Sequence, residues 1–279
     1  MLSFLAIADG GAALEATIAA ATHFARLVGG EAQALHVRDA LADHRAGHSA
    51  YAIGPAIDAT LKAGEAKAAA RATAARAVYE RLAAGLPNAR FIDTDGDEDA
   101  RATAYGRLCD IIVIGRPGAD QAKPEPEHVR AAVFHTGRGV MVVPPQWQPG
   151  AIDHAVLAWN GTPQAARALG HALPLLRHAA KVTVVSADKG DEEGIQPDAS
   201  AVADYLTRRG VKASAARFDP GAGSARARGR ALLNCLAAQA GDFLVMGAYG
   251  EPGMLRFLGL GGATGKVITG CPAPVLLAH

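Results

Sequence analysis

The feature that most constrains the fold is a motif that occurs twice: an aspartate, a short apolar run and then Gly-x-x-Gly. The two copies are DIIVIGRPG at 110–118 and DFLVMGAYG at 242–250. Two further pairs of segments occur in the same order in each half, namely LAIADGG near residue 5 with VLAWNGT near residue 156, and GVMVVPP at 139–145 with APVLLAH at 273–279. One match would carry little weight, but three matches in series indicate that a half-length unit has been duplicated.

Each half alternates short apolar segments with helical ones. In the first half the pattern predicts strands near 2–8, 32–37, 89–93, 110–115 and 139–143, and helices near 12–28, 56–84, 98–107 and 126–136. In the second half it predicts strands near 153–159, 181–187, 211–217, 242–247 and 274–278, and helices near 163–178, 198–209, 224–240 and 262–269. Thr162 followed by Pro163 is a typical helix start, because threonine caps the free N–H groups and proline has none to satisfy.

Short, continuously apolar strands separated by helices are typical of a parallel sheet covered on both faces. We therefore expect an α/β protein with two doubly wound, parallel, five-stranded sheets. The segment PPQWQPG at 144–150 predicts a linker, so the expected domains are 1–146 and 151–279. In such sheets ligands bind at the carboxyl ends of the strands, where the strand order reverses.

The composition excludes several functional classes. The chain has 279 residues with 28 Lys and Arg against 27 Asp and Glu, which gives no overall field for binding nucleic acid or an acidic membrane. The three cysteines, Cys109, Cys235 and Cys271, are far apart and form neither a disulfide framework nor a zinc motif, which fits a reducing compartment. No signal sequence or membrane-spanning stretch is evident, so we expect a cytoplasmic protein.

Five segments resemble one family: AWNGTPQAARALGHALPLL at 158–176, GGATGKVITGCPAPVLLAH at 261–279, GVMVVPP at 139–145 and the two copies of the aspartate motif. Together they resemble a tandem universal stress protein, with two UspA-like domains in one chain. The resemblance implies the strand order 3-2-1-4-5 of the adenine nucleotide alpha-hydrolase-like fold. It also implies pairing through the fifth strands, which a tandem chain satisfies internally as a pseudo-dimer. Some members of the family bind ATP and others do not.

A glycine-rich segment in the second half is the main candidate for a phosphate site. ATP-binding members of the family carry G-x-x-G, nine residues and then G-[S/T]; Gly247 and Gly250 match the start, but Leu260 stands where the next glycine is expected. The residues that would surround phosphate are Gly247, Gly250, Arg256, Gly261, Gly262 and Thr264. Glycines allow backbone N–H groups to approach an anion, and a helix start adds partial positive charge. The alternative is that these glycines only permit a tight loop before the last helix.

Three residues are candidates for the nucleoside end of the same site. Asn160 follows the first strand of the second half and has the hydrogen-bonding groups for a ribose or an adenine edge, although capping the following turn is its other expected use. Trp159 is a candidate for stacking on a base, and Val185 for backbone contacts to adenine. In the first half Asp9 is present, but no second glycine pair follows Gly118, so that phosphate loop is expected to be degenerate.

These features predict a cytoplasmic stress-response or regulatory protein that binds an adenine nucleotide with Mg²⁺ in its second half. Nucleotide occupancy would then bias assembly, including any homodimer beyond the internal pseudo-dimer. The alternative is a nucleotide-free scaffold that binds a partner protein or another small ligand. No catalytic signature stands out, so at most a weak ATPase activity is expected. His44 and His48 have the spacing of metal ligands on a helix, but Gly47 disfavours that helix and we expect no metal site.

Overall fold

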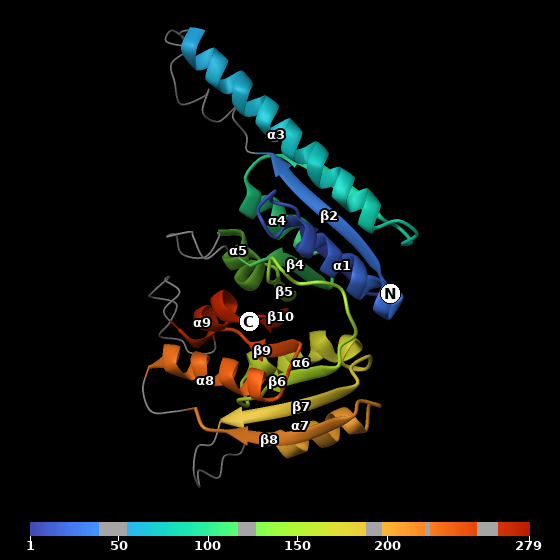
Figure 1. The fold of residues 1–279 in the computed structure, drawn as a ribbon, viewed down its shortest axis with the longest axis vertical. Helices are drawn as coiled ribbons and strands as arrows, with labels where there is room; N and C mark the ends of the chain where they lie inside the picture. Colours follow the sequence, from blue (N-terminus) through green and yellow to red (C-terminus); the bar gives the residue numbers. More distant parts are fainter. Residues whose placement is uncertain (39–54, 117–126, 188–196, 221–223, 250–261) are drawn as a thin grey trace.

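The computed structural model describes residues 1–38, 55–116, 127–187, 197–220, 224–249 and 262–279, and Figure 1 shows how their helices and strands are arranged. The first half contains the strands β1 (Ser3–Ile7), β2 (Glu31–Arg38), β3 (Arg90–Asp95), β4 (Ile111–Gly115) and β5 (Gly139–Val143), and the helices α1 (Leu14–Val28), α3 (Pro55–Leu82), α4 (Glu98–Gly106) and α5 (Glu127–His135). The second half contains the strands β6 (His154–Ala158), β7 (Lys181–Ala187), β8 (Ala213–Phe218), β9 (Phe243–Gly247) and β10 (Val275–Ala278), and the helices α6 (Pro163–Leu176), α7 (Ala199–Thr207), α8 (Ala225–Ala238) and α9 (Ala263–Gly270). Each element overlaps the segment predicted for it.

Within the described residues the strands form one ten-stranded sheet, in the order β3-β2-β1-β4-β5-β10-β9-β6-β7-β8. Each half has the order 3-2-1-4-5, and neighbouring strands within a half are parallel. The halves join through the antiparallel pair β5 and β10, in which Leu276 lies opposite Met141. The doubly wound fold class is therefore confirmed, and the two five-stranded sheets are continuous with each other.

Helices cover both faces of this sheet (Figure 1). The core layer beneath α1, α3, α6 and α7 includes Ile18, Tyr79, Leu169 and Val202. The layer beneath α4, α5, α8 and α9 includes Ala102, Val129, Leu232 and Val267. Each layer takes residues from both halves, so burial of apolar surface stabilises the two halves together.

The repeated aspartate has the same structural role in both halves. Asp110 accepts hydrogen bonds from the backbone N–H of Ser3 at 2.8 Å and from its hydroxyl at 2.9 Å. Asp242 accepts from the backbone N–H groups of Asp153 at 2.8 Å and His154 at 3.1 Å. In each case the carboxylate at the start of the fourth strand satisfies backbone donors at the start of the first. The aspartates of the motif thus join the starts of two neighbouring strands by hydrogen bonds, which explains their presence without a ligand.

The segment predicted as a linker is tied to the core by Trp147. The Trp147 ring stacks on Phe24 of α1, with ring centroids 5.6 Å apart and an interplanar angle of 22°. Phe24 in turn lies 5.7 Å from Phe243 of β9, so the three aromatic rings connect α1, the linker and the second half. Such ring pairs stabilise beyond the area that they bury.

The first glycine of each motif copy is explained by helix packing. Gly115 ends β4, and a Cβ atom there would lie 2.6 Å from Cβ of Ala13. Gly247 ends β9, and a Cβ atom there would lie 2.6 Å from the backbone nitrogen of Ala165. In both halves the start of the first helix packs directly onto this glycine, so its presence does not by itself indicate a ligand.

Replacing Gly115 or Gly247 with alanine should destabilise the protein by about 1–3 kcal/mol, because the added methyl group overpacks a close helix–strand contact. Gly170 is the matched control: it is exposed in α6, and no atom of the described residues lies within 4 Å of an added Cβ. Gly170→Ala should therefore stabilise the protein by roughly 0.5–1 kcal/mol through helix propensity. Urea denaturation gives the free energy of unfolding of all three variants. If Gly247→Ala were as stable as the wild type, the packing argument would be contradicted.

His23 packs beside the same aromatic contact, where burial favours its neutral form. Its ring centroid lies 5.3 Å from Phe24 and 5.8 Å from Trp147, and its Nε2 is buried without a hydrogen-bond partner among the described residues. Burial lowers the pKa of His23 and repulsion by Arg26 lowers it further, while a hydrogen bond that the ring donates to the Gly150 backbone raises it. Burial also lowers the pKa of His171, as does Arg138.

These lowered pKa values predict that acid destabilises the fold. Above pH of about 6.5 both states carry a neutral His23, but below it the unfolded chain takes up the proton first. Stability should therefore fall as the pH decreases from about 6.5 to the folded-state pKa. In thermal melts from pH 7 to pH 5, His23→Phe should lose less stability than the wild type, whereas His178→Gln, at an exposed position, should not differ from it. If the stability of His23→Phe fell with pH as steeply as that of the wild type, His23 would not be the source of the acid sensitivity.

Candidate functional site

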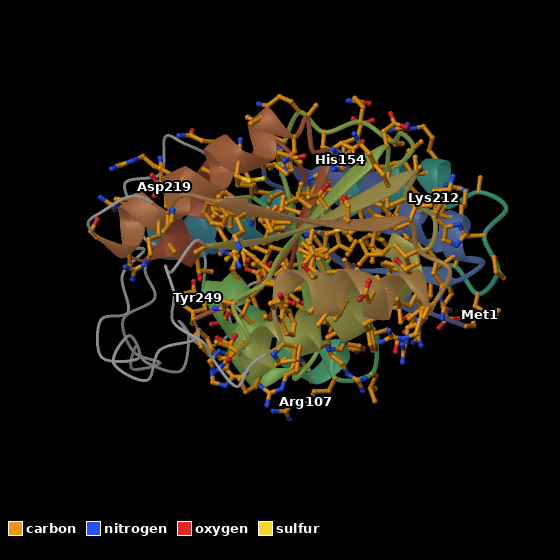
Figure 2. All side chains as sticks on the ribbon, turned by 90° about the horizontal axis from the view of Figure 1, so that it is seen from below. Met1, Arg107, His154, Lys212, Asp219 and Tyr249 are labelled. Atoms are coloured by element: carbon orange, nitrogen blue, oxygen red, sulfur yellow. The ribbon has the colours of Figure 1, made fainter. Side chains whose placement is uncertain are left out.

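The carboxyl ends of β6 and β9 define the candidate site. These strands are parallel neighbours at the point where the strand order of the second half reverses. In Figure 2, Asp219 and Tyr249, which follow β8 and β9, lie at one end of the second half, whereas His154 and Lys212, at the amino ends of β6 and β8, lie toward the other. Of the residues predicted for ligand binding, Trp159 and Asn160 follow β6, Gly247 ends β9 and Val185 lies within β7.

Asn160 closes the turn between β6 and α6. Its Oδ1 accepts hydrogen bonds from the backbone N–H of Thr162 at 3.3 Å and from the Thr162 hydroxyl at 2.8 Å. Thr162 then caps α6 by accepting from the Ala165 N–H at 3.3 Å. Asp9 makes the equivalent turn in the first half, where its Oδ1 accepts from the Gly11 N–H at 2.9 Å. The turn-capping use of Asn160 is thus confirmed, and its contact with a ribose or an adenine stays a prediction.

The structure brings Trp159 and Val185 together. The Trp159 backbone N–H donates to the Val185 carbonyl at 2.8 Å, which continues the pairing of β6 with β7. The indole Nε1 of Trp159 donates to the Pro197 carbonyl at 2.7 Å, so the ring is anchored beside the start of α7. The side chain of Val185 is fully buried, which leaves only its backbone for a ligand. Contact of either residue with a base stays a prediction.

The start of α9 faces the end of β9 through one hydrogen bond. Thr264, in the first turn of α9, is buried, and its Oγ1 accepts from the backbone N–H of Tyr249 at 3.2 Å. Gly262 is the N-cap and supplies no side-chain hydrogen bond, and the first turn contains no acidic residue. The first N–H groups of a helix have no partner within it, so this end of α9 carries partial positive charge.

Three of the predicted phosphate-site residues, Gly250, Arg256 and Gly261, lie outside the described residues. Their roles stay predictions. His44 and His48 also lie outside. Of the six predicted phosphate-site residues, the structure therefore describes three: Gly247 at the end of β9, and Gly262 and Thr264 at the start of α9.

Sequence reasoning missed the surroundings of Tyr249. The Tyr249 ring lies 5.0 Å from the ring of Phe134, which belongs to α5 in the first half. Phe134 also lies 4.7 Å from the ring of His279, and Nδ1 of His279 donates to the Ala248 carbonyl at 3.1 Å. No local motif marks these residues. Only the expected pairing of the fifth strands could have indicated that α5 lies near the end of β9.

The cysteines are unsuited to nucleophilic chemistry. Burial raises the pKa of the Cys109 thiol to about 12 and that of Cys271 to about 11, and it also raises the pKa of Cys235. All three are therefore neutral thiols near pH 7, whereas a reactive cysteine needs its thiolate. Cys109 and Cys271 are buried, and Cys235 is partly buried.

Two kinds of feature, a metal-ligand cluster and a membrane-spanning helix, are absent from the part of the chain that the structure describes. It contains no group of three or more His, Cys, Asp or Glu side chains that could hold a metal ion. No helix within the same ranges combines the length and apolar character that crossing a membrane requires.

Comparison with known proteins bears on the fold. No family model and no curated protein matches the sequence. A universal stress protein from Archaeoglobus fulgidus superposes with a TM-score of 0.71 at 15% identity, over 99% of this chain and 97% of that one. A protein of unknown function from Pseudomonas aeruginosa superposes with a TM-score of 0.57 at 15% identity, over 99% of this chain and 92% of that one. At these identities the likeness shows the fold alone: this chain shares the fold of the universal stress protein from Archaeoglobus fulgidus along nearly its whole length.

Proposed function

We propose that this protein is a cytoplasmic stress-response regulator whose second half binds an adenine nucleotide together with Mg²⁺. The phosphates would lie in the turn between β9 and α9, against Gly247, Gly250, Arg256, Gly261, Gly262 and Thr264. The nucleoside would lie toward Trp159, Asn160 and Val185 at the carboxyl ends of β6 and β7. Occupancy would bias assembly with other copies or partners rather than drive catalysis.

The observation that carries this proposal is that α9 begins without a side-chain cap next to the carboxyl end of β9. Its N-cap is a glycine without a side-chain hydrogen bond, and no acidic residue occupies its first turn. The hydrogen bond from the Tyr249 N–H to Thr264 holds this helix start against the carboxyl end of β9. Free N–H groups at a helix start, set at the switch point of a parallel sheet, favour an anion such as a phosphate.

The first half offers less to a phosphate. No glycine occurs between Gly118 and Gly137, so its sequence lacks the second glycine pair. The residue that follows β4 is Arg116, and its Nη1 donates to the Cys271 carbonyl of the second half at 2.7 Å. This cation serves the contact between the halves. We therefore place the nucleotide in the second half.

Three observations favour a second candidate function, a scaffold that binds a partner protein or another small ligand without a nucleotide. The indole N–H of Trp159 is bonded to Pro197, and Oδ1 of Asn160 is bonded to Thr162. Both side chains proposed for the nucleoside thus already have partners in the protein. Packing of α6 explains Gly247 without any ligand.

Calorimetric titration with ATP and Mg²⁺ separates the two functions, with Thr264→Val as the diagnostic variant. This change removes the hydroxyl that accepts from the Tyr249 N–H but keeps the shape of the side chain. Losing one hydrogen bond should weaken nucleotide binding about two- to tenfold. Thr269→Val is the matched control, because Thr269 lies at the other end of α9 and its hydroxyl donates to the Gly265 carbonyl.

We expect saturable heat from the wild type, the same affinity for Thr269→Val and weaker binding by Thr264→Val. No heat from the wild type at about 1–5 mM nucleotide would rule out the nucleotide site and leave the scaffold. Equal affinity of the wild type and Thr264→Val would show that the nucleotide binds elsewhere.

A further inference from the structure

The pairing of β5 with β10 places part of the first half beside the candidate site of the second. Because this pair is antiparallel, the amino end of β5 lies next to the carboxyl end of β10, with Val140 opposite Leu277. β10 is the parallel neighbour of β9, so their carboxyl ends lie together. α5 ends at His135, just before β5 begins, and therefore reaches this edge of the sheet.

The contact that results involves Phe134 near the end of α5. Its ring lies 5.0 Å from that of Tyr249 and 4.7 Å from that of His279, and all three side chains are partly buried. His279 donates through Nδ1 to the Ala248 carbonyl at 3.1 Å. Of the two residues after β9, Tyr249 is thus contacted by Phe134 of the first half, and Ala248 is bonded to His279, the residue after β10.

Tyr249 has a backbone conformation that needs such support. Its φ is 52°, in the left-handed region that residues other than glycine rarely adopt. A conformation of this kind persists where the surroundings fix it from several sides. Here the N–H of Tyr249 is bonded to Thr264, its ring packs on Phe134 and the preceding carbonyl is bonded to His279.

We infer that Phe134 of the first half is a positioning residue for the nucleotide site of the second half. By holding the Tyr249 ring, it fixes this left-handed residue just after β9 and keeps the Tyr249 N–H on Thr264. The inference rests on the proposed function for its nucleotide, but the positioning itself is measurable without one. The first half then completes a site that it does not itself contain.

The experiment compares four variants of the full chain in two measurements. Phe134→Ala and Phe134→Leu remove the ring, and Phe134→Tyr keeps it. Val129→Ala truncates a fully buried side chain of the same helix, outside the ring contact, and so controls for loss of stability. The first measurement is amide hydrogen exchange at Tyr249 by NMR without nucleotide, and the second is calorimetric affinity for ATP with Mg²⁺.

Loss of an aromatic pair should accelerate exchange at Tyr249 about two- to tenfold and weaken nucleotide binding by a similar factor in Phe134→Ala and Phe134→Leu. Phe134→Tyr and Val129→Ala should match the wild type in both measurements. Unchanged exchange at Tyr249 in Phe134→Ala, or equal acceleration in Val129→Ala, would overturn the inference. If the wild type binds no nucleotide, the proposed function fails, and the exchange measurement alone decides whether Phe134 positions the turn.

Discussion

The antiparallel pairing of β5 with β10 is the constraint on which the rest of the structure depends. It leaves each five-stranded half with its own strand order but makes the two halves one sheet, with core layers that continue across both faces. It also brings the last helix of one half to the carboxyl edge of the other. Arg116 reaches the Cys271 carbonyl at one such edge, and Phe134 meets Tyr249 at the other. Joining the two halves in one sheet therefore provides contacts at the carboxyl edges of both halves that a single half could not make.

The glycines of the repeated motif illustrate how packing and ligand binding can favour the same residue. Gly115 and Gly247 are equally required by the approach of a helix start, although the two halves differ in the residues that follow. The case for a nucleotide accordingly rests on features that the first half does not share. These are the glycine N-cap of α9 and the hydroxyl of Thr264, which set the helix start against the end of β9.

The fold was predictable from the sequence because its signals are local. Continuously apolar strands and Thr162 with Pro163 at the start of α6 each specify an element from a few neighbouring residues. The site was predictable only in part. Asn160 follows β6 and Thr264 lies in the first turn of α9, whereas the contact of Tyr249 with Phe134 depends on the register of two strands far apart in the chain. No local pattern encodes such a contact, and Gly250, Arg256 and Gly261 lie outside the described residues.

Native-state hydrogen exchange of the strand amides tests the joining of the halves most directly. If β5 and β10 pair at the centre of one sheet, amides at Met141 and Leu276 should be protected as strongly as those of β4 and β9, because only global unfolding would expose them. Amides on the outer strands β3 and β8 should exchange faster, since those strands have a neighbour on one side only within the described residues. Protection at Met141 and Leu276 no greater than that of β3 and β8 would mean that the halves do not share a sheet.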